Sequence, residues 1–123
     1  MNAAKLALAA SFALASVGLA QAQQTIALDD LDADRINPSQ VVIEFEYDGS
    51  ACESVGIAEV GDLVDGTLSV TFPTMASAEV CTQQIVEIEV EQAVNVPEGV
   101  THVAVTLLAA DGSVKSTASE RID

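Results

Sequence analysis

The chain has 123 residues, half of them hydrophobic, and a formal net charge of −15 at pH 7. This acidic excess argues against nucleic acid and anionic membrane surfaces as partners, because proteins recognise both through Lys and Arg side chains. The chain has no Trp and few other aromatic residues, which argues against the stacking platforms that bind sugars and bases. The charge is expected to keep the protein soluble, and the alternative is that it serves a dedicated cationic partner.

Residues 1–22 have the pattern of a secretory signal peptide. Lys5 is followed by an apolar run that ends in the small residues Ala20 and Ala22. The run is shorter than the roughly 20 residues that a membrane span requires, and no Cys follows it directly to accept a lipid. We therefore expect cleavage before Gln23, a periplasmic or secreted mature protein, and no membrane association after cleavage.

Residues 23–40 are expected to form an acidic, exposed lead-in that contains a short strand at 25–28. Asp30, Asp32 and Asp34 alternate along this segment, as carboxylates do at the start of a calcium-binding loop. Arg35 stands where such a loop needs Gly, and Val41 stands where it needs Glu. We expect a solvated acidic linker, with the three Asp residues as an alternative calcium candidate.

From residue 41 to residue 123 the sequence predicts one all-β domain. Hydrophobic and polar residues alternate within several segments, as in strands that have one buried face and one solvated face. These segments are 41–47, 66–72, 85–91 and 100–109, with shorter strands expected at 54–59 and 114–118. Turn residues separate them, at 48–50, 61–62, 97–99 and 111–112. About six to eight short strands with such punctuation predict an antiparallel two-sheet sandwich of the immunoglobulin-like type.

Cys52 and Cys81 are the only cysteines of the chain. In an exported protein they are expected to form a disulfide bond. The competing hypothesis is a metal site with His102, but a second His and a Cys-x-x-Cys pair are both missing. No cofactor is expected.

Short motifs that are spread over most of the mature chain resemble those of a known class of proteins. They are Cys52, Gly66-Thr-Leu-Ser-Val70, Cys81-Thr82, Pro97-x-Gly99, Val103-x-Val105 and Asp111-Gly112. In this order they resemble small single-disulfide β-sandwich proteins, broadly immunoglobulin-like, that Gram-negative bacteria export. The Trp that true immunoglobulin domains carry between their cysteines is missing, so the resemblance implies an architecture and not an activity.

The sequence carries no recognisable catalytic constellation. His102 is the only His, it is expected on the solvated side of its strand, and no Gly-x-Ser-x-Gly motif is present. A copper site of the sandwich type would need a second His. We therefore expect a protein that is not an enzyme, with a small periplasmic hydrolase that uses His102 as an alternative.

Two rows of glutamates alternate with apolar residues along the predicted strands. The rows are Glu44 and Glu46 in one strand, and Glu87, Glu89 and Glu91 in another. If the two strands paired, like charges would face each other and destabilise the sheet. We therefore expect the rows to lie apart or to bind a counter-charge. The rows are candidates for a face that docks a basic protein segment or a cation, and the alternative is a solvated face that protects a sheet edge.

Taken together, the sequence predicts an exported, non-enzymatic β-sandwich that acts as a binding or structural module. A divalent-cation binding protein, with calcium as the ion, is the first alternative. The basic protein segment is the partner that the acidic composition favours, and neither nucleic acid nor membrane is expected.

The signal peptide generates a direct prediction. The exported protein is expected to begin at Gln23, because Ala20 and Ala22 are correctly placed for the signal peptidase at the end of the apolar run. Intact-mass measurement of periplasmic protein checks this expectation. A mature species that keeps residues 6–20 would show that the leader is an anchor instead.

Overall fold

The first sheet is built around two strands that carry the clearest alternation in the sequence. The structure, a computed structural model, describes residues 26–77, 81 and 84–123. In it, β2 (Gln40–Ser50) and β7 (Ile85–Asn95) pair antiparallel over eleven residues with no shift in register. Both strands are longer than predicted, because the turn expected at 48–50 is the end of β2 and β7 continues beyond residue 91. Their alternation is confirmed.

β1 (Asp29–Asn37) pairs antiparallel with the other side of β2, so the sheet order is β1-β2-β7. This differs from the exposed acidic linker expected for the segment. Leu31 and Ala33 point toward the core, and Ala33 is only 1% exposed, while Asp30, Asp32 and Asp34 are exposed. A strand with only two inward-facing apolar residues shows a weak hydrophobic alternation. Its many acidic residues therefore favour the prediction of a linker. The strand predicted at 25–28 is wrong for residues 26–28, and Thr25 lies outside the described residues.

The second sheet has the order β4-β5-β8-β9. Its strands are β4 (Glu59–Val64), β5 (Thr67–Phe72), β8 (His102–Leu108) and β9 (Val114–Arg121). β5 and β8 pair in parallel, and the other neighbours pair antiparallel. β4 was not predicted, because all of its residues are exposed and Gly61 and Asp62 have the composition of a turn. They lie instead where the register of β4 shifts against β5, as in a β-bulge.

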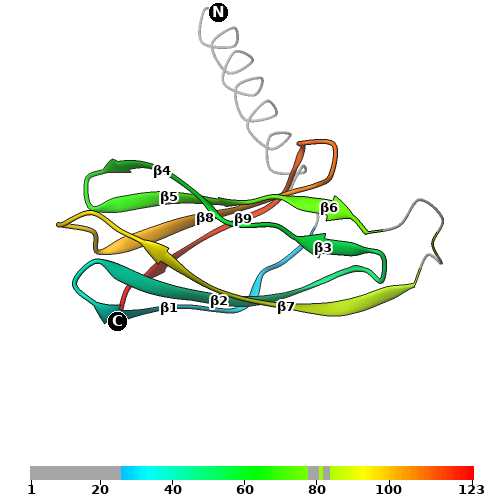
Figure 1. The fold of residues 1–123 in the computed structure, drawn as a ribbon, viewed down its shortest axis with the longest axis horizontal. Helices are drawn as coiled ribbons and strands as arrows, with labels where there is room; N and C mark the ends of the chain where they lie inside the picture. The colour runs from blue at the N-terminus through cyan, green and yellow to red at the C-terminus, as the bar shows by residue number, and fades with distance from the viewer. Residues whose placement is uncertain (1–25, 78–80, 82–83) are drawn as a thin grey trace, which may run out of the picture.

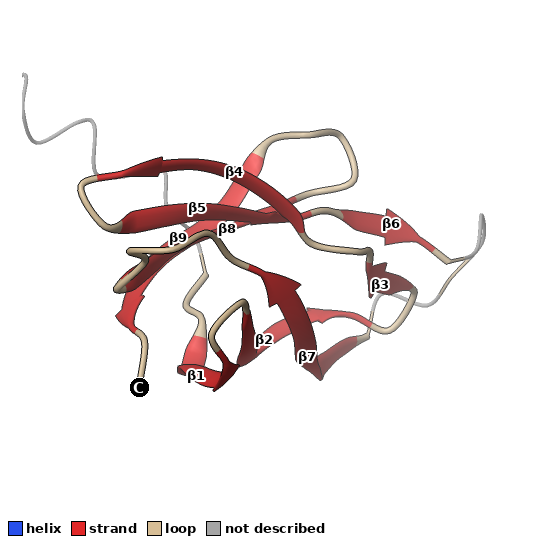
Figure 2. Cartoon of the chain, turned by 60° about the vertical axis from the view of Figure 1, so that its left-hand side comes forward, coloured by secondary structure: helices blue, strands red, loops and turns tan. Residues whose placement is uncertain are grey.

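The two sheets form the two layers of a sandwich (Figure 1). A small pair, β3 (Glu53–Val55) with β6 (Thr74–Ala76), lies at one end of the layers (Figure 2). The core between the layers takes its largest side chains from Phe45, Tyr47 and Phe72, and the Phe45 and Phe72 rings meet edge to face at 5.1 Å. The inward positions predicted for β5 and β8 are confirmed, since Leu68, Val70, Val103, Val105 and Leu107 are all buried.

The two lateral sides of the sandwich are closed differently. On one side the C-terminal residues join the layers: Ala33 and Ile122 form a parallel bridge, and the Arg35 amide donates to the Asp123 carbonyl at 3.0 Å. On the other side β7 and β4 are the last strands of their sheets, and within the described residues no strand pairs with their outer edges. The Gln92 side chain connects the layers there. It donates to the Gly56 carbonyl at 2.8 Å and accepts from the Ala58 amide at 2.9 Å.

Cys52 and Cys81 form the expected disulfide, with their Cα atoms 5.9 Å apart. Cys52 follows β2, and Cys81 precedes β7, so the disulfide connects the end of β2 to the beginning of β7. The all-β sandwich and the disulfide are therefore confirmed. The predicted signal peptide, residues 1–22, lies outside the described residues. Within the described ranges, the structure contains no helix with the length and hydrophobicity of a membrane span.

The disulfide is expected to contribute substantially to stability. It closes a loop with a sequence separation of 29 residues, for which the chain-entropy estimate is about 3.6 kcal/mol. Chemical denaturation with and without a phosphine reductant measures the effect, and a variant with both Cys52→Ala and Cys81→Ala serves as the control. Reduction is expected to destabilise the natural protein and leave the control unchanged. An identical denaturation midpoint for the reduced and oxidised natural protein would contradict the prediction.

Candidate functional site: an acidic face on the first sheet

The outer face of the first sheet carries carboxylates on all three of its strands. We call it the acidic face and define it by nine residues. They are Asp30, Asp32 and Asp34 of β1, Glu44, Glu46 and Asp48 of β2, and Glu87, Glu89 and Glu91 of β7. The face exists because each strand places its apolar residues on the core side, which leaves the alternate positions for solvent.

The strand register brings the two glutamate rows together. Glu44 lies opposite Glu91, and Glu46 lies opposite Glu89. The expectation that the rows lie apart is therefore wrong. Pairing β2 with β7 buries a continuous apolar face. The free energy of this burial outweighs the electrostatic repulsion between the like charges on the solvent side.

Asp30, Asp32 and Asp34 belong to the same surface and not to a loop of their own. Asp32 lies opposite Glu44 in the register, and Asp34 lies opposite Val42. Asp32 and Asp34 are alternate residues of a strand and lie about 6.6 Å apart. Among the described residues, the three Asp carboxylates do not form a group close enough to share an ion, as they would in a calcium loop. The structure joins them instead to the glutamates of β2.

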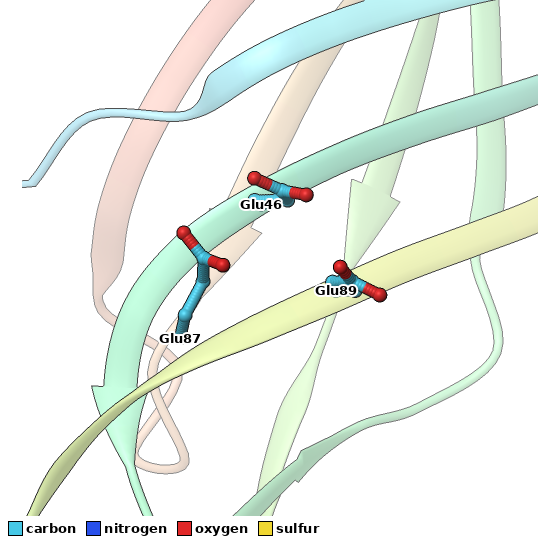
Figure 3. Close-up of side chains that lie close together, drawn as sticks. All are labelled: Glu46, Glu87 and Glu89. Atoms are coloured by element: carbon cyan, nitrogen blue, oxygen red, sulfur yellow. The ribbon is translucent and has the colours of Figure 1, made fainter.

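One group of carboxylates is close enough to share an ion. One carboxylate oxygen from each of Glu46, Glu87 and Glu89 lies within 4.8 Å of the other two, and Figure 3 shows the three side chains side by side on β2 and β7. Glu87 and Glu89 are exposed, and Glu46 is partly exposed. An open hollow of about 490 Å³ lies next to this group, lined by Asp30, Asp32, Glu44, Glu46, Glu89 and Glu91 among others. The arrangement offers oxygen ligands and negative charge, but it is not an enclosed cage.

The crowding of carboxylates raises the pKa of the two glutamates in the middle strand. For Glu44 the main cause is the charge of Glu91, followed by partial desolvation and by the charges of Asp34 and Asp32. For Glu46 the main cause is the charge of Glu87, again followed by desolvation and by Glu89 and Asp30. A raised carboxyl pKa means that the folded state disfavours the charged form at these positions.

The cationic side chains of the described residues are engaged elsewhere or lie in the other sheet. Arg35 donates to the Val100 carbonyl at 2.9 Å and to the Pro38 carbonyl at 3.4 Å. Lys115 pairs with Glu53 at 3.0 Å. Arg121 is part of β9. Within the described residues, no ion pair to the acidic face is formed.

A second charged group, Tyr47 with Glu53 and Lys115, is a structural network that the sequence did not indicate. The Tyr47 hydroxyl donates to Glu53 at 2.6 Å, the Ser50 amide donates at 2.9 Å, and the Lys115 ammonium lies 5.4 Å from the centre of the Tyr47 ring. Burial alone would raise the pKa of Glu53, but the hydrogen bonds from Tyr47, Ser50 and Lys115 and the Lys115 charge outweigh it and lower that pKa. Burial raises the pKa of Tyr47. No local pattern links these three positions, so only the fold reveals the network.

His102 lies at the start of β8 and is exposed, as expected. Its Nδ1 atom is 2.9 Å from the Thr101 hydroxyl. Because Cys52 and Cys81 are joined to each other, they do not form the metal site with His102 that competed with the disulfide.

Comparison with protein-family models, with curated proteins and with solved structures finds no match to this chain. The structure confirms two parts of the resemblance to small exported sandwich proteins, the all-β architecture and the single disulfide. Membership of that group stays a prediction.

The opposite pKa shifts generate a prediction for stability. Because the pKa values of Glu44 and Glu46 are raised on folding, the free energy of unfolding is expected to rise as pH falls from 7 toward the ordinary Glu value of 4.5. The lowered pKa of Glu53 acts in the opposite direction, since its stabilisation is lost as pH falls further. Denaturant titrations across this range are therefore expected to show a maximum at mildly acidic pH.

The control separates this effect from the net charge of the chain. Changing Glu44 and Glu46 to Gln is expected to flatten the rise between pH 7 and pH 4.5. Changing Glu59 and Glu98 to Gln, at two exposed positions outside the acidic face, is expected to preserve most of the rise in the free energy of unfolding. A stability that declines steadily from pH 7 downward in the natural protein would contradict the account.

Proposed function

We propose that the protein is an exported, non-enzymatic binding module and that the acidic face holds its cationic partner, a basic protein segment. The observation that carries the proposal is the position of Glu44 and Glu46 in the middle strand. Each faces a carboxylate of β7 in the register, and Glu44 also faces Asp32 of β1. A bound cation would relieve this repulsion, so folding and binding would stabilise each other.

The shape of the face favours an extended partner over a single compact ion. The carboxylates run along three neighbouring strands and do not converge on one enclosed centre. A basic polypeptide segment can place several Lys or Arg side chains along such rows, and long-range attraction would speed its encounter with the face. The export that the proposal assumes is supported by the disulfide, which is typical of oxidising compartments.

Divalent-cation binding, with calcium as the ion, is the second candidate function. It is supported by the close approach of Glu46, Glu87 and Glu89, because Ca²⁺ prefers carboxylate oxygens. Calcium takes about six to eight oxygen ligands, so water would have to complete the shell at this open position. Weak binding is therefore expected, with an affinity in the range of extracellular calcium modules.

The test uses a Lys-rich peptide as the probe and two variants of equal net charge. The acidic-face variant changes Glu44, Glu46, Glu87, Glu89 and Glu91 to Gln. The control variant neutralises five acidic residues outside the face, namely Glu59, Asp62, Asp65, Glu98 and Glu120. Calorimetry at low salt is expected to show that the acidic-face variant loses about tenfold or more in affinity, while the control stays close to the natural protein. Binding should weaken in all cases as salt screens the charges.

An equal loss of affinity in both variants would contradict the proposal, because it would mean that the peptide responds to net charge alone. The calcium candidate is tested on the same proteins. CaCl₂ is expected to raise the melting temperature of the natural protein more than that of a variant with Glu46, Glu87 and Glu89 changed to Gln. The same rise in both would exclude this group as the calcium site.

A further inference from the structure

The outer edge of β7 is a long and regular strand edge. β7 ends the first sheet, so its hydrogen-bonding groups on the side away from β2 have no strand partner within the described residues. The strand is eleven residues long and pairs with β2 without a bulge. β4, which ends the second sheet on the same side of the sandwich, has six residues and a register shift. The pairings of β1 and β9, the terminal strands on the other side, also contain register shifts. Among the terminal strands of the two sheets, only β7 therefore offers a regular row of backbone donors and acceptors of this length.

Two hollows lie along this edge, one on each side of the Gln92 side chain. The first has a volume of about 340 Å³ and includes Val55, Ile88 and Val90 in its lining. The second has a volume of about 360 Å³ and includes Ile57, Val60 and Val94. Ile57 is 84% exposed and Val60 is 45% exposed. The two hollows thus combine these apolar side chains with polar ones such as Ser54 and Gln92, while the solvent side of the β7 edge carries Glu87, Glu89 and Glu91.

We propose that β7 binds an extended segment of a second protein as an added strand in which apolar residues alternate with Lys or Arg. This inference rests on the proposed function and specifies the form of the cationic partner. In an added strand, alternate side chains point to opposite faces of the sheet. The basic residues would lie beside Glu87, Glu89 and Glu91, and the apolar residues would point toward the two hollows. Backbone hydrogen bonds would supply affinity, and the alternation would supply specificity.

Like-charge repulsion disfavours a second copy of this chain as the occupant. An antiparallel β7–β7 pair that keeps the apolar faces aligned would bring Glu87, Glu89 and Glu91 of the two copies against one another, which destabilises such a pair. The undescribed parts of the same chain do not fit either. Among residues 1–25, 78–80, 82 and 83, Lys5 is the only basic residue. A basic segment of another protein is therefore the occupant that fits this edge.

The experiment compares three synthetic peptides of about nine residues, a common strand length, on the natural protein. The first alternates Lys and Val. The second contains the same residues with all Lys grouped at one end. The third is the alternating peptide with N-methyl groups on alternate amides, which removes hydrogen-bond donors and keeps the charge. The alternating peptide is expected to bind about tenfold or more tightly than the other two. The grouped peptide cannot place its Lys residues on one face and its Val residues on the other, and the N-methylated peptide cannot make the full ladder of hydrogen bonds.

Hydrogen exchange followed by NMR measures how strongly each backbone amide is protected. Charge attraction alone is not expected to change the protection along one strand edge. The alternating peptide is expected to slow amide exchange along β7 and to leave exchange in β9 unchanged. Ile57→Ser, which removes an exposed apolar side chain at the second hollow, is expected to weaken binding of the alternating peptide only. Val114→Ser, at an exposed residue of β9, is the matched control and is expected to have no effect.

Each pattern of results decides between the two proposals. If all three peptides bind equally, and binding is lost when Glu87, Glu89 and Glu91 are changed to Gln, the acidic face binds cations but strand addition is wrong. If none of the peptides binds at low salt, both proposals are wrong. Protection spread evenly over the molecule, with no excess at β7, would also overturn strand addition.

Discussion

The uninterrupted pairing of β2 with β7 is the constraint on which the other features depend. It places Phe45 opposite Val90 and Tyr47 opposite Ile88 on the core side. The same register necessarily places Glu44 opposite Glu91 and Glu46 opposite Glu89 on the solvent side. A slip by one residue would separate these charges only by turning the apolar residues outward and the glutamates into the core. The repulsion is therefore fixed by the burial of the apolar face, and the molecule cannot relieve it by changing register.

This coupling gives the acidic face its proposed role. Carboxylates on flexible loops could move apart, whereas those on β2 and β7 are held in rows by the sheet. The glutamates on β7 would act in two ways in this account. They disfavour pairing with a second copy of β7, as charged residues do at many natural sheet edges, and they favour an incoming strand with basic residues at alternate positions. Specificity of this kind combines a repulsive element with an attractive one.

The sequence predicted those parts of the structure that depend on local patterns. Alternation identified β2, β5, β7 and β8 and the side of each strand that is buried, and the cysteines identified the disulfide. The three-residue β6 was not predicted, and β1 and β4 were missed for two different reasons. In β1 the many acidic residues obscured a short apolar alternation. In β4 all residues are exposed, so its sequence shows no alternation between a buried and a solvated face.

The candidate site was predicted only in pieces. Its glutamates and the three Asp residues of β1 were recognised as two separate groups, because nothing in a single sequence specifies which strands are neighbours. Like charges on their own disfavour the observed pairing, but exposed electrostatic repulsion is weaker than the apolar burial on the core side of the same strands. The contact of Lys115 with Glu53 joins residues that are 62 positions apart, and it likewise follows only from the topology.

A double-mutant cycle on Glu46 and Glu89 tests the central claim most directly. Each single change to Gln should remove the same repulsion, so each is expected to raise the free energy of unfolding at low salt. The double change should then raise it by less than the sum of the two single effects, and the shortfall should shrink as salt is added. The pair Glu46 and Glu98 provides the reference for independent sites. Additive effects for Glu46 and Glu89, or single variants that are less stable than the natural protein, would contradict the account.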